Sequence, residues 1–572
     1  MRDTTLLDGT WRFQPDPYGE GDRNGYHAAG FDDDAWCEVA VPSDFSQNIP
    51  EMDFYEGGGW YRRRLDAPVS WDGRRVVLRF EGVNNHARVW MNGECVGKNA
   101  DPYLPFECDV SDVLQCGGAN SVVVYADNTS NPGDVPGNLR GWRTFGGILR
   151  SVSLIVTDRV HLGSIATVCE ADGRIRAHVT VCNNSETSSS VAASLCIDEA
   201  ALELTADAVN IDAGGEVTME MSGTLGDVEP WSPDSPRLYN ATIAVQRSGE
   251  VVDTIGLRIG FRTVEVGKGV LLLNGEPIYV TGFNRHEDGA GCNMTPDPEM
   301  TRSDLELMKA SGSNFVRLCH YPHDSHELDL CDELGLLVMA EVPLYWWTGK
   351  WDEENHDAKF AAAKRQLGTM IERDVNHPSV MIWSVSNENA EHAPGVVEGN
   401  RELVAIARSL DSSRLVVHVS NHWTEVRSFE DDDLIAINAY PAWGRMHKGG
   451  NEEFTLQDAT AWWADELEKL HACYPEKPIL VAEFGHPALP GVTNGAFGEA
   501  TQVAALAAEF EAMHAPYICG ALIWCFADHP WPGGFDFVRF MTVSTYGVVT
   551  RDRRPKPSLE AMARLFREKQ AG

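Results

Sequence analysis

The sequence predicts a multidomain chain in which two β-sandwiches precede an eight-stranded (β/α)8 TIM barrel. Three observations support this prediction. The 572 residues are too many for one hydrophobic core. Short β-branched or alternating runs dominate up to about residue 263, and strand and helix patterns alternate from there onward. The expected domain ranges are 1–157, 158–263 and 264–572.

The first range is predicted to be a jelly-roll β-sandwich, and the second an immunoglobulin-like one. In the first, runs such as 75–80 are β-branched or alternating, and Asn92-Gly93 supplies a tight hairpin turn. The second, of about a hundred residues, has further short strand patterns. Its Cys182 and Cys196 suit an intersheet disulfide, but the absence of an export signal argues for reduced thiols.

The third range is predicted to be the barrel, because helical patterns lie between most of its strand patterns. The expected strands are 278–283, 314–319, 336–341, 379–386, 415–419, 434–438, 478–482 and 519–524. Glu388 follows the fourth strand pattern and Glu483 follows the seventh. Catalytic residues of such barrels lie at the carboxyl ends of the strands, so we expect these two carboxylates to meet there.

Two carboxylates at one barrel mouth are the minimum needed to cleave a glycosidic bond. Burial beside a second carboxylate would keep Glu388 protonated as a general acid. A nucleophile must be ionised, so we expect the pKa of Glu483 to stay below that of Glu388. Asn387 is placed to bind a sugar hydroxyl. The structural alternatives are a helix N-cap for Glu388 and a salt bridge for Glu483.

Composition excludes several other classes of protein. The formal net charge of −38 disfavours nucleic acid and anionic membranes as partners, and no stretch is long enough to span a membrane. The N-terminus lacks the apolar core of a signal peptide, so we expect a cytoplasmic location. His320, His323 and His326 do not match a helical metal motif, because Pro322 interrupts them. We therefore expect no metal and no cofactor.

Four barrel runs resemble motifs of glycoside hydrolase family 2. They are 281–288, 315–322, 383–388 and 482–485, and the second has Cys319 where the family usually has serine. Runs 7–13, 60–63 and 146–150 resemble the N-terminal part of the family. The resemblance implies a retaining exo-β-glycosidase that acts on a carbohydrate or glycoside conjugate and forms a homo-oligomer. It makes Glu388 the acid/base and Glu483 the nucleophile, with carboxyl groups about 5–5.5 Å apart.

The same resemblance suggests further sugar-binding residues. His286 and His320 lie at the tips of the first two strands, Asn438 ends the sixth, and Tyr440 follows it. Tyr440 resembles a tyrosine that donates a hydrogen bond to the nucleophile. Trp524 ends the last strand and would stack on a sugar face. The alternatives are core packing for the two aromatic residues and a structural role for each histidine.

The identity of the sugar is less well defined. Bacterial β-glucuronidases of this family carry Asn-x-Lys before Thr-Arg-Asp-Arg, where this chain has Ser544 and Tyr546. The missing lysine favours a neutral sugar, with a β-galactoside as the leading expectation. The alternative is a β-galacturonide or β-glucuronide whose carboxylate binds Arg143 or Arg539. Transglycosylation remains an alternative to hydrolysis. A non-catalytic carbohydrate-binding protein is the alternative from a different functional class.

Overall fold

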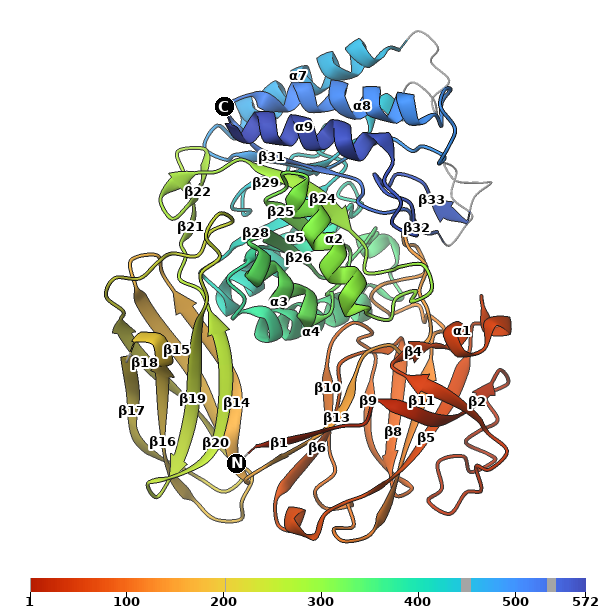
Figure 1. Cartoon of the computed structure of the whole chain (residues 1–572), viewed down its shortest axis with the longest axis vertical. Coiled ribbons are helices and arrows are strands. Elements are labelled where there is room, and N and C mark those ends of the chain that lie inside the picture. The colour runs from red at the N-terminus through yellow and green to blue at the C-terminus, as the bar shows by residue number, and fades with distance from the viewer. Residues whose placement is uncertain (1, 201, 444–453, 532–541, 572) are drawn as a thin grey trace.

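The computed structural model describes residues 2–571 except residue 201 and the segments 444–453 and 532–541. Figure 1 shows two β-sandwiches lying on the same side of a β/α barrel, as the sequence predicts. Among the described helices, none is long and apolar enough to cross a membrane. We propose that the domain boundaries fall after residues 157 and 263, because β13 ends at Thr157 and β21 begins at Val264.

The first sandwich contains a four-stranded and a six-stranded antiparallel sheet. The four-stranded sheet has the order β1 (Asp3–Leu6), β13 (Val152–Thr157), β6 (Arg75–Phe80), β10 (Phe106–Asp109). The other has the order β3 (Cys37–Val41), β2 (Gly9–Asp16), β5 (Gly58–Asp66), β11 (Ala119–Asp127), β8 (His86–Met91), β9 (Glu94–Asn99). Asn92 and Gly93 join β8 to β9 with φ of 54° and 87°, as an Asn-Gly hairpin turn requires.

Three very short strands and one short helix complete the first sandwich on its barrel side. The strands are β4 (Ser43–Asp44), β7 (Val83–Asn84) and β12 (Gly147–Ile148), and α1 (Phe45–Asn48) follows β4. Arg150, just past β12, donates hydrogen bonds of 2.9 Å to Glu287 Oε2 and to the carbonyl oxygen of Pro322. Both acceptors belong to the barrel, so this buried arginine ties the first sandwich to the barrel mouth.

The second sandwich has a three-stranded and a four-stranded sheet. The strands are β14 (Val160–Cys169), β15 (Arg174–Asn183) and β18 (Glu216–Thr224) in one sheet, and β17 (Leu202–Ile211), β16 (Ser189–Ile197), β19 (Tyr239–Arg247) and β20 (Glu250–Ile259) in the other. Alternate residues of β15 are buried, which is the period-2 pattern of a half-buried strand. Cys182 and Cys196 are free thiols, like the other cysteines.

Eight parallel strands close the barrel. They are β24 (Val280–Arg285), β25 (Phe315–Leu318), β26 (Leu337–Glu341), β27 (Val380–Asn387), β28 (Leu415–Ser420), β29 (Ile435–Asn438), β30 (Ile479–Phe484) and β31 (Ile518–Ile523). The helices are α2 (Pro298–Ala310), α3 (Ser325–Leu334), α4 (His356–Asp374), α5 (Val396–Leu410), α6 (Pro441–Trp443), α7 (Leu456–Cys473), α8 (Glu499–Glu511) and α9 (Pro557–Ala571). The sheet β21 (Val264–Gly267), β22 (Val270–Leu273), β23 (Glu276–Pro277) precedes the barrel, and the ribbon β32 (His529–Pro530), β33 (Val543–Ser544) follows β31.

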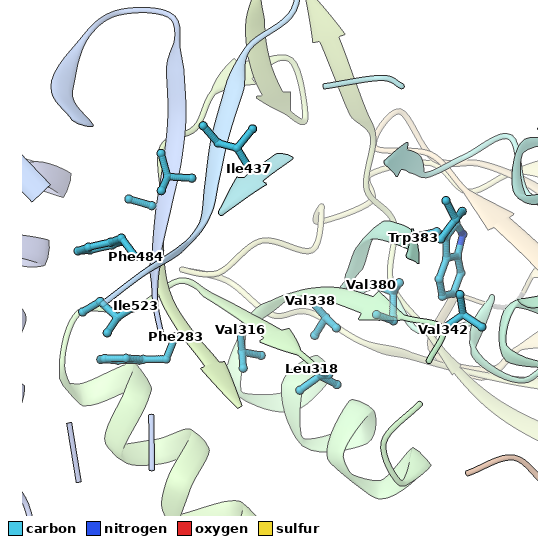
Figure 2. Close-up of a cluster of buried hydrophobic side chains, with 14 of the residues drawn as sticks. Phe283, Val316, Leu318, Val338, Val342, Val380, Trp383, Ile437, Phe484 and Ile523 are labelled. Atoms are coloured by element: carbon cyan, nitrogen blue, oxygen red, sulfur yellow. The ribbon is translucent and has the colours of Figure 1, made fainter. Parts of the chain in front are cut away.

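Both faces of the barrel strands are buried, which explains their continuous apolar sequence patterns. Val316 and Val338 belong to the layer between strands and helices, part of which Figure 2 shows. Phe315 and Leu337, one residue earlier, belong to the core inside the barrel. Arg317 shares the parity of Phe315, so the strand directs its guanidinium into the barrel.

Candidate active site

The two glutamates lie at the carboxyl ends of β27 and β30, as expected. Glu388 directly follows β27 and has a φ of 50°, and Glu483 is the penultimate residue of β30. Register shifts interrupt β27 between Ser384 and Asn387, and β30 between Val481 and Phe484. A bulge re-aims the side chains that follow it. The side chains of Ala482 and Glu483 therefore both point into the barrel, instead of to opposite faces of the strand. Phe484 packs in the layer between the strands and the helices.

Three neutral donors hold the half-buried carboxyl group of Glu388. Asn438 Nδ2 donates to Oε1 at 2.8 Å. Trp346 Nε1 and Asn421 Nδ2 donate to Oε2 at 2.9 and 3.1 Å. These bonds fix the orientation of the group.

The carboxyl group of Glu483 has a different environment. It is 3% exposed; Arg317 Nη1 donates to Oε1 at 2.6 Å, and the Tyr440 hydroxyl donates to Oε2. Burial raises the pKa of Glu483 to about 8, and the charge of Glu388 adds to this rise, although Arg317 and Tyr440 oppose it. The loss of water therefore outweighs these two favourable partners, and burial acts against the expectation that the pKa of Glu483 stays below that of Glu388.

Arg317 connects the two halves of this site, and the sequence analysis did not identify it. Its guanidinium is fully buried and donates to Glu341 Oε2 at 2.6 Å, to Asn387 Oδ1 at 2.7 Å and to Glu483. Asn438 Nδ2 also donates to Asn387 Oδ1, at 3.1 Å, and so links Glu388 to the same network. A lone arginine within a four-residue buried strand pattern was the available signal.

The two expected histidines form a wall beside this network. His320 Nδ1 is 2.6 Å from Glu341 Oε1, and its Nε2 is 3.8 Å from Glu483 Oε1. Burial lowers the pKa of His320 to about 4, so near neutral pH the ring is uncharged and Nδ1 carries the proton toward Glu341. His286 Nδ1 lies 3.2 Å from the Tyr321 hydroxyl. Its Nε2 is buried and has no hydrogen-bond partner among the described residues.

Aromatic rings complete the wall. Trp524, 7% exposed, stacks on His320 with ring centroids 5.1 Å apart and meets His286 edge-on at 5.4 Å. Trp142 comes from the first sandwich, and its ring lies 5.9 and 5.7 Å from the same two histidines. The first sandwich therefore supplies part of the wall of the barrel site. A flat apolar ring beside polar nitrogen atoms suits the face of a sugar.

Arg143, expected at the site, is engaged elsewhere. Its Nη2 donates to Asp53 Oδ1 at 2.7 Å, and its guanidinium lies 4.0 and 4.5 Å from the ring centroids of Phe54 and Phe145. These partners all belong to the first sandwich, so its described side-chain contacts do not reach the two glutamates. The other expected cation, Arg539, lies outside the described residues.

Two clusters offer donor atoms of the kinds that bind metal ions. His286, Cys319 and His320 place two ring nitrogens and one sulfur within 4.8 Å of one another, on the wall just described. Asp329, Asp332 and His377 form a second cluster. Asp332 already binds His377 Nδ1 at 2.6 Å and the backbone N–H of Ser379 at 2.9 Å, which indicates a structural role for that cluster.

Comparisons with known proteins match nearly the whole chain. Sequence models described as "Glycosyl hydrolases family 2, sugar binding domain", "Glycosyl hydrolases family 2" and "Glycosyl hydrolases family 2, TIM barrel domain" match residues 5–158, 160–262 and 264–570. The chain is 28% identical to a β-glucuronidase from Paenibacillus borealis, over 99% of this chain and 97% of that protein.

Two solved structures share the fold along 99% of this chain. One is a β-galacturonidase from Eisenbergiella tayi bound to galacturonate, at 26% identity and a TM-score of 0.87, with 97% of that chain covered. The other is a β-glucuronidase from Ruminococcus gnavus in complex with D-glucuronic acid, at 25% identity and a TM-score of 0.86, with 98% covered.

Proposed function

Because the chain belongs to glycosyl hydrolases family 2 and is a glycoside hydrolase, we propose that it is a retaining exo-β-hexuronidase. It removes a terminal β-linked galacturonic or glucuronic acid residue by double displacement. The observation that carries the reaction is one hydrogen-bonded network, through Asn438, Asn387 and Arg317, that joins Glu388 to Glu483. The separation of about 5–5.5 Å that a retaining mechanism requires stays a prediction.

The sugar assignment draws on the relatives and on one absent residue. The relatives and structures named above are β-glucuronidases and a β-galacturonidase, which favours a hexuronide over the β-galactoside that was the leading expectation. The Asn-x-Lys lysine of bacterial β-glucuronidases is absent, since Ser544 and Tyr546 stand there. We therefore place the galacturonide ahead of the glucuronide.

The contacts suggest how the two steps proceed. Glu483, ionised, attacks the anomeric carbon while Glu388 gives its proton to the leaving oxygen, which breaks the glycosidic bond and forms a glycosyl ester. Glu388, now ionised, takes a proton from water, and that water opens the ester. Arg317 and Tyr440 stabilise the negative charge of Glu483 before attack and after release.

Unpaired polar atoms suggest where the sugar hydroxyls bind. Asn387 Nδ2, His286 Nε2 and Asn438 Oδ1 are buried and have no hydrogen-bond partner within the described part of the chain. Leaving such groups unpaired costs about 1–3 kcal/mol each, and sugar hydroxyls beside them would remove that cost. Trp524 then supplies the apolar face, and His320 Nε2 accepts a further hydroxyl hydrogen.

A panel of nitrophenyl β-glycosides tests the substrate. Galacturonide, glucuronide, galactoside, glucoside, mannoside and fucoside are assayed side by side. We expect kcat/KM for a hexuronide to exceed that for the galactoside by about 10²-fold or more, because the site should discriminate a carboxylate from a hydroxymethyl group by several kcal/mol. Equal rates on galactoside and hexuronides would refute the hexuronidase assignment and leave the glycosidase intact.

Two substitutions test the catalytic pair separately from the sugar. Glu388→Gln and Glu483→Gln should each lower kcat by about 10²–10⁴-fold or more while the circular dichroism spectrum persists. Glu425→Gln changes an exposed glutamate and serves as the matched control. Wild-type turnover in either active-site variant would sink the assignment of roles.

A further inference from the structure

One wall of the hollow gathers soft ligand atoms from two neighbouring strands. His286 directly follows β24, and Cys319 and His320 directly follow β25. The two strands are parallel neighbours in the barrel, so their ends lie side by side. The three side chains are 6%, 0% and 1% exposed, and their ligand atoms lie within 4.8 Å of one another.

The orientation of both imidazoles leaves one nitrogen available. Nδ1 of His320 is held by Glu341 at 2.6 Å, and Nδ1 of His286 by the Tyr321 hydroxyl at 3.2 Å. A histidine that binds a metal usually has its other nitrogen held in this way by a carboxylate or another polar group. His286 Nε2 has no hydrogen-bond partner among the described residues although it is buried.

An arginine and two carboxylates lie beside these ligand atoms. The guanidinium of Arg317 is matched by Glu341 and Glu483, each at 2.6 Å. Glu341 also holds His320 Nδ1, so this network fixes the ring that carries one of the ligand atoms.

We propose that His286 Nε2, His320 Nε2 and Cys319 Sγ form an inhibitory site for a soft divalent cation of the zinc class. Two imidazoles and one thiolate suit zinc, with a fourth position open to the hollow. On binding, the thiol proton passes to solvent and a metal–sulfur bond forms, so no oxidant or reductant is consumed. Because both histidines also face the proposed sugar position, the cation and the glycone exclude each other.

This site depends on the thiol of Cys319, the one soft sulfur ligand of the cluster. A serine hydroxyl is a hard, un-ionised donor and a poor ligand for zinc. The expectation of no metal site considered His320, His323 and His326 along one segment. The proposed donors instead come from two strands that only the folded barrel brings together.

The test measures binding of metal ions directly. The reduced protein is titrated with ZnCl2 by calorimetry and with CdCl2 by ultraviolet absorption of the cadmium–thiolate bond. We expect one tight equivalent that galacturonate or glucuronate displaces. Cys319→Ser should weaken zinc binding by at least about 10–100-fold, the range seen when even an outer partner of a metal ligand is lost. The spectrum of cadmium-loaded Cys319→Ser is subtracted from that of the cadmium-loaded wild type. The difference should have the absorption of one cadmium-bound thiolate, because the contribution of the exposed cysteines is the same in both proteins and cancels.

Cys525→Ser provides the matched control. Cys525 is another buried thiol in the same apolar cluster, and its Sγ lies 3.7 Å from His529 Nδ1. It should leave zinc affinity and zinc inhibition unchanged, with inhibition measured against each variant's own metal-free rate. Equal zinc affinity in wild type and Cys319→Ser, or no binding to wild type, would overturn the site. Since binding is read without turnover, this outcome is independent of whether the hexuronidase assignment holds.

Discussion

Replacing Tyr440 with phenylalanine tests how the site controls the charge of Glu483. The Tyr440 hydroxyl donates to Glu483 Oε2 and favours the ionised carboxylate, against the burial that raises its pKa to about 8. A hydrogen bond to a charged group contributes about 1.5–3 kcal/mol, and about 1.4 kcal/mol corresponds to one pKa unit. Loss of the hydroxyl should therefore raise the pKa by about 1–2 units, to about 9–10.

The assay is kcat/KM for a nitrophenyl glycoside as a function of pH. The nucleophile works only when ionised, so activity should rise with pH through the pKa of Glu483, with a wild-type midpoint near about 8. At a pH below the midpoint, each unit by which the pKa rises lowers the ionised fraction of Glu483 about tenfold. Tyr440→Phe should therefore be about 10–100-fold slower near pH 7. The deficit should shrink as pH rises toward the new midpoint.

Tyr546→Phe is the control for this experiment. The ring of Tyr546 lies 5.8 Å from that of Tyr440 in the same cluster, and within the described part of the chain its hydroxyl makes no bond to Glu483. It should leave the midpoint in place. If Tyr440→Phe kept the wild-type midpoint, or lost the same fraction of activity at every pH, the electrostatic role of the hydroxyl would be refuted.

Two further predictions concern the acid/base and the buried network. Glu388→Ala should lose about 10²–10⁴-fold in turnover of a poor leaving group, because no acid protonates the leaving oxygen. On an activated aryl glycoside, where the second step limits the rate, added azide should restore turnover and yield a β-glycosyl azide; an α-configured product would contradict retention. Arg317→Met should lower the free energy of unfolding in urea by about 3–5 kcal/mol, because Glu341 and Glu483 would be left buried without their cation. Arg401→Met, which removes an exposed partner of the exposed Glu430, should cost about 1 kcal/mol or less, and equal losses in the two variants would argue against the network.

The barrel could be predicted because its sequence signal is local. Parallel strands buried on both faces read as apolar runs, and all eight expected runs correspond to observed strands. The ends differ by at most two residues, for example 278–283 against Val280–Arg285, because apolar character alone does not mark where a strand begins. The strand tips that carry Glu388 and Glu483 followed from the same signal.

The electrostatics of the site could not be predicted in this way. Arg317 and Glu483 are 166 positions apart, and their contact exists only after the barrel closes. The sequence does not show that burial raises the pKa of Glu483 by more than Arg317 lowers it. It also does not show that a bulge in β30 directs the carboxylate into the barrel. The contact of Arg143 could not be predicted for the same reason, since its partner Asp53 lies 90 positions away in the same sandwich.

In the proposed hexuronidase, the first sandwich forms part of the active site. Trp142 lies against both site histidines, and Arg150 binds Glu287 and the Pro322 carbonyl next to them. All of these groups are buried, so separating the two domains would expose the histidine wall and leave Glu287 without its cation. The barrel alone would then hold the two carboxylates without the surface that positions a sugar between them.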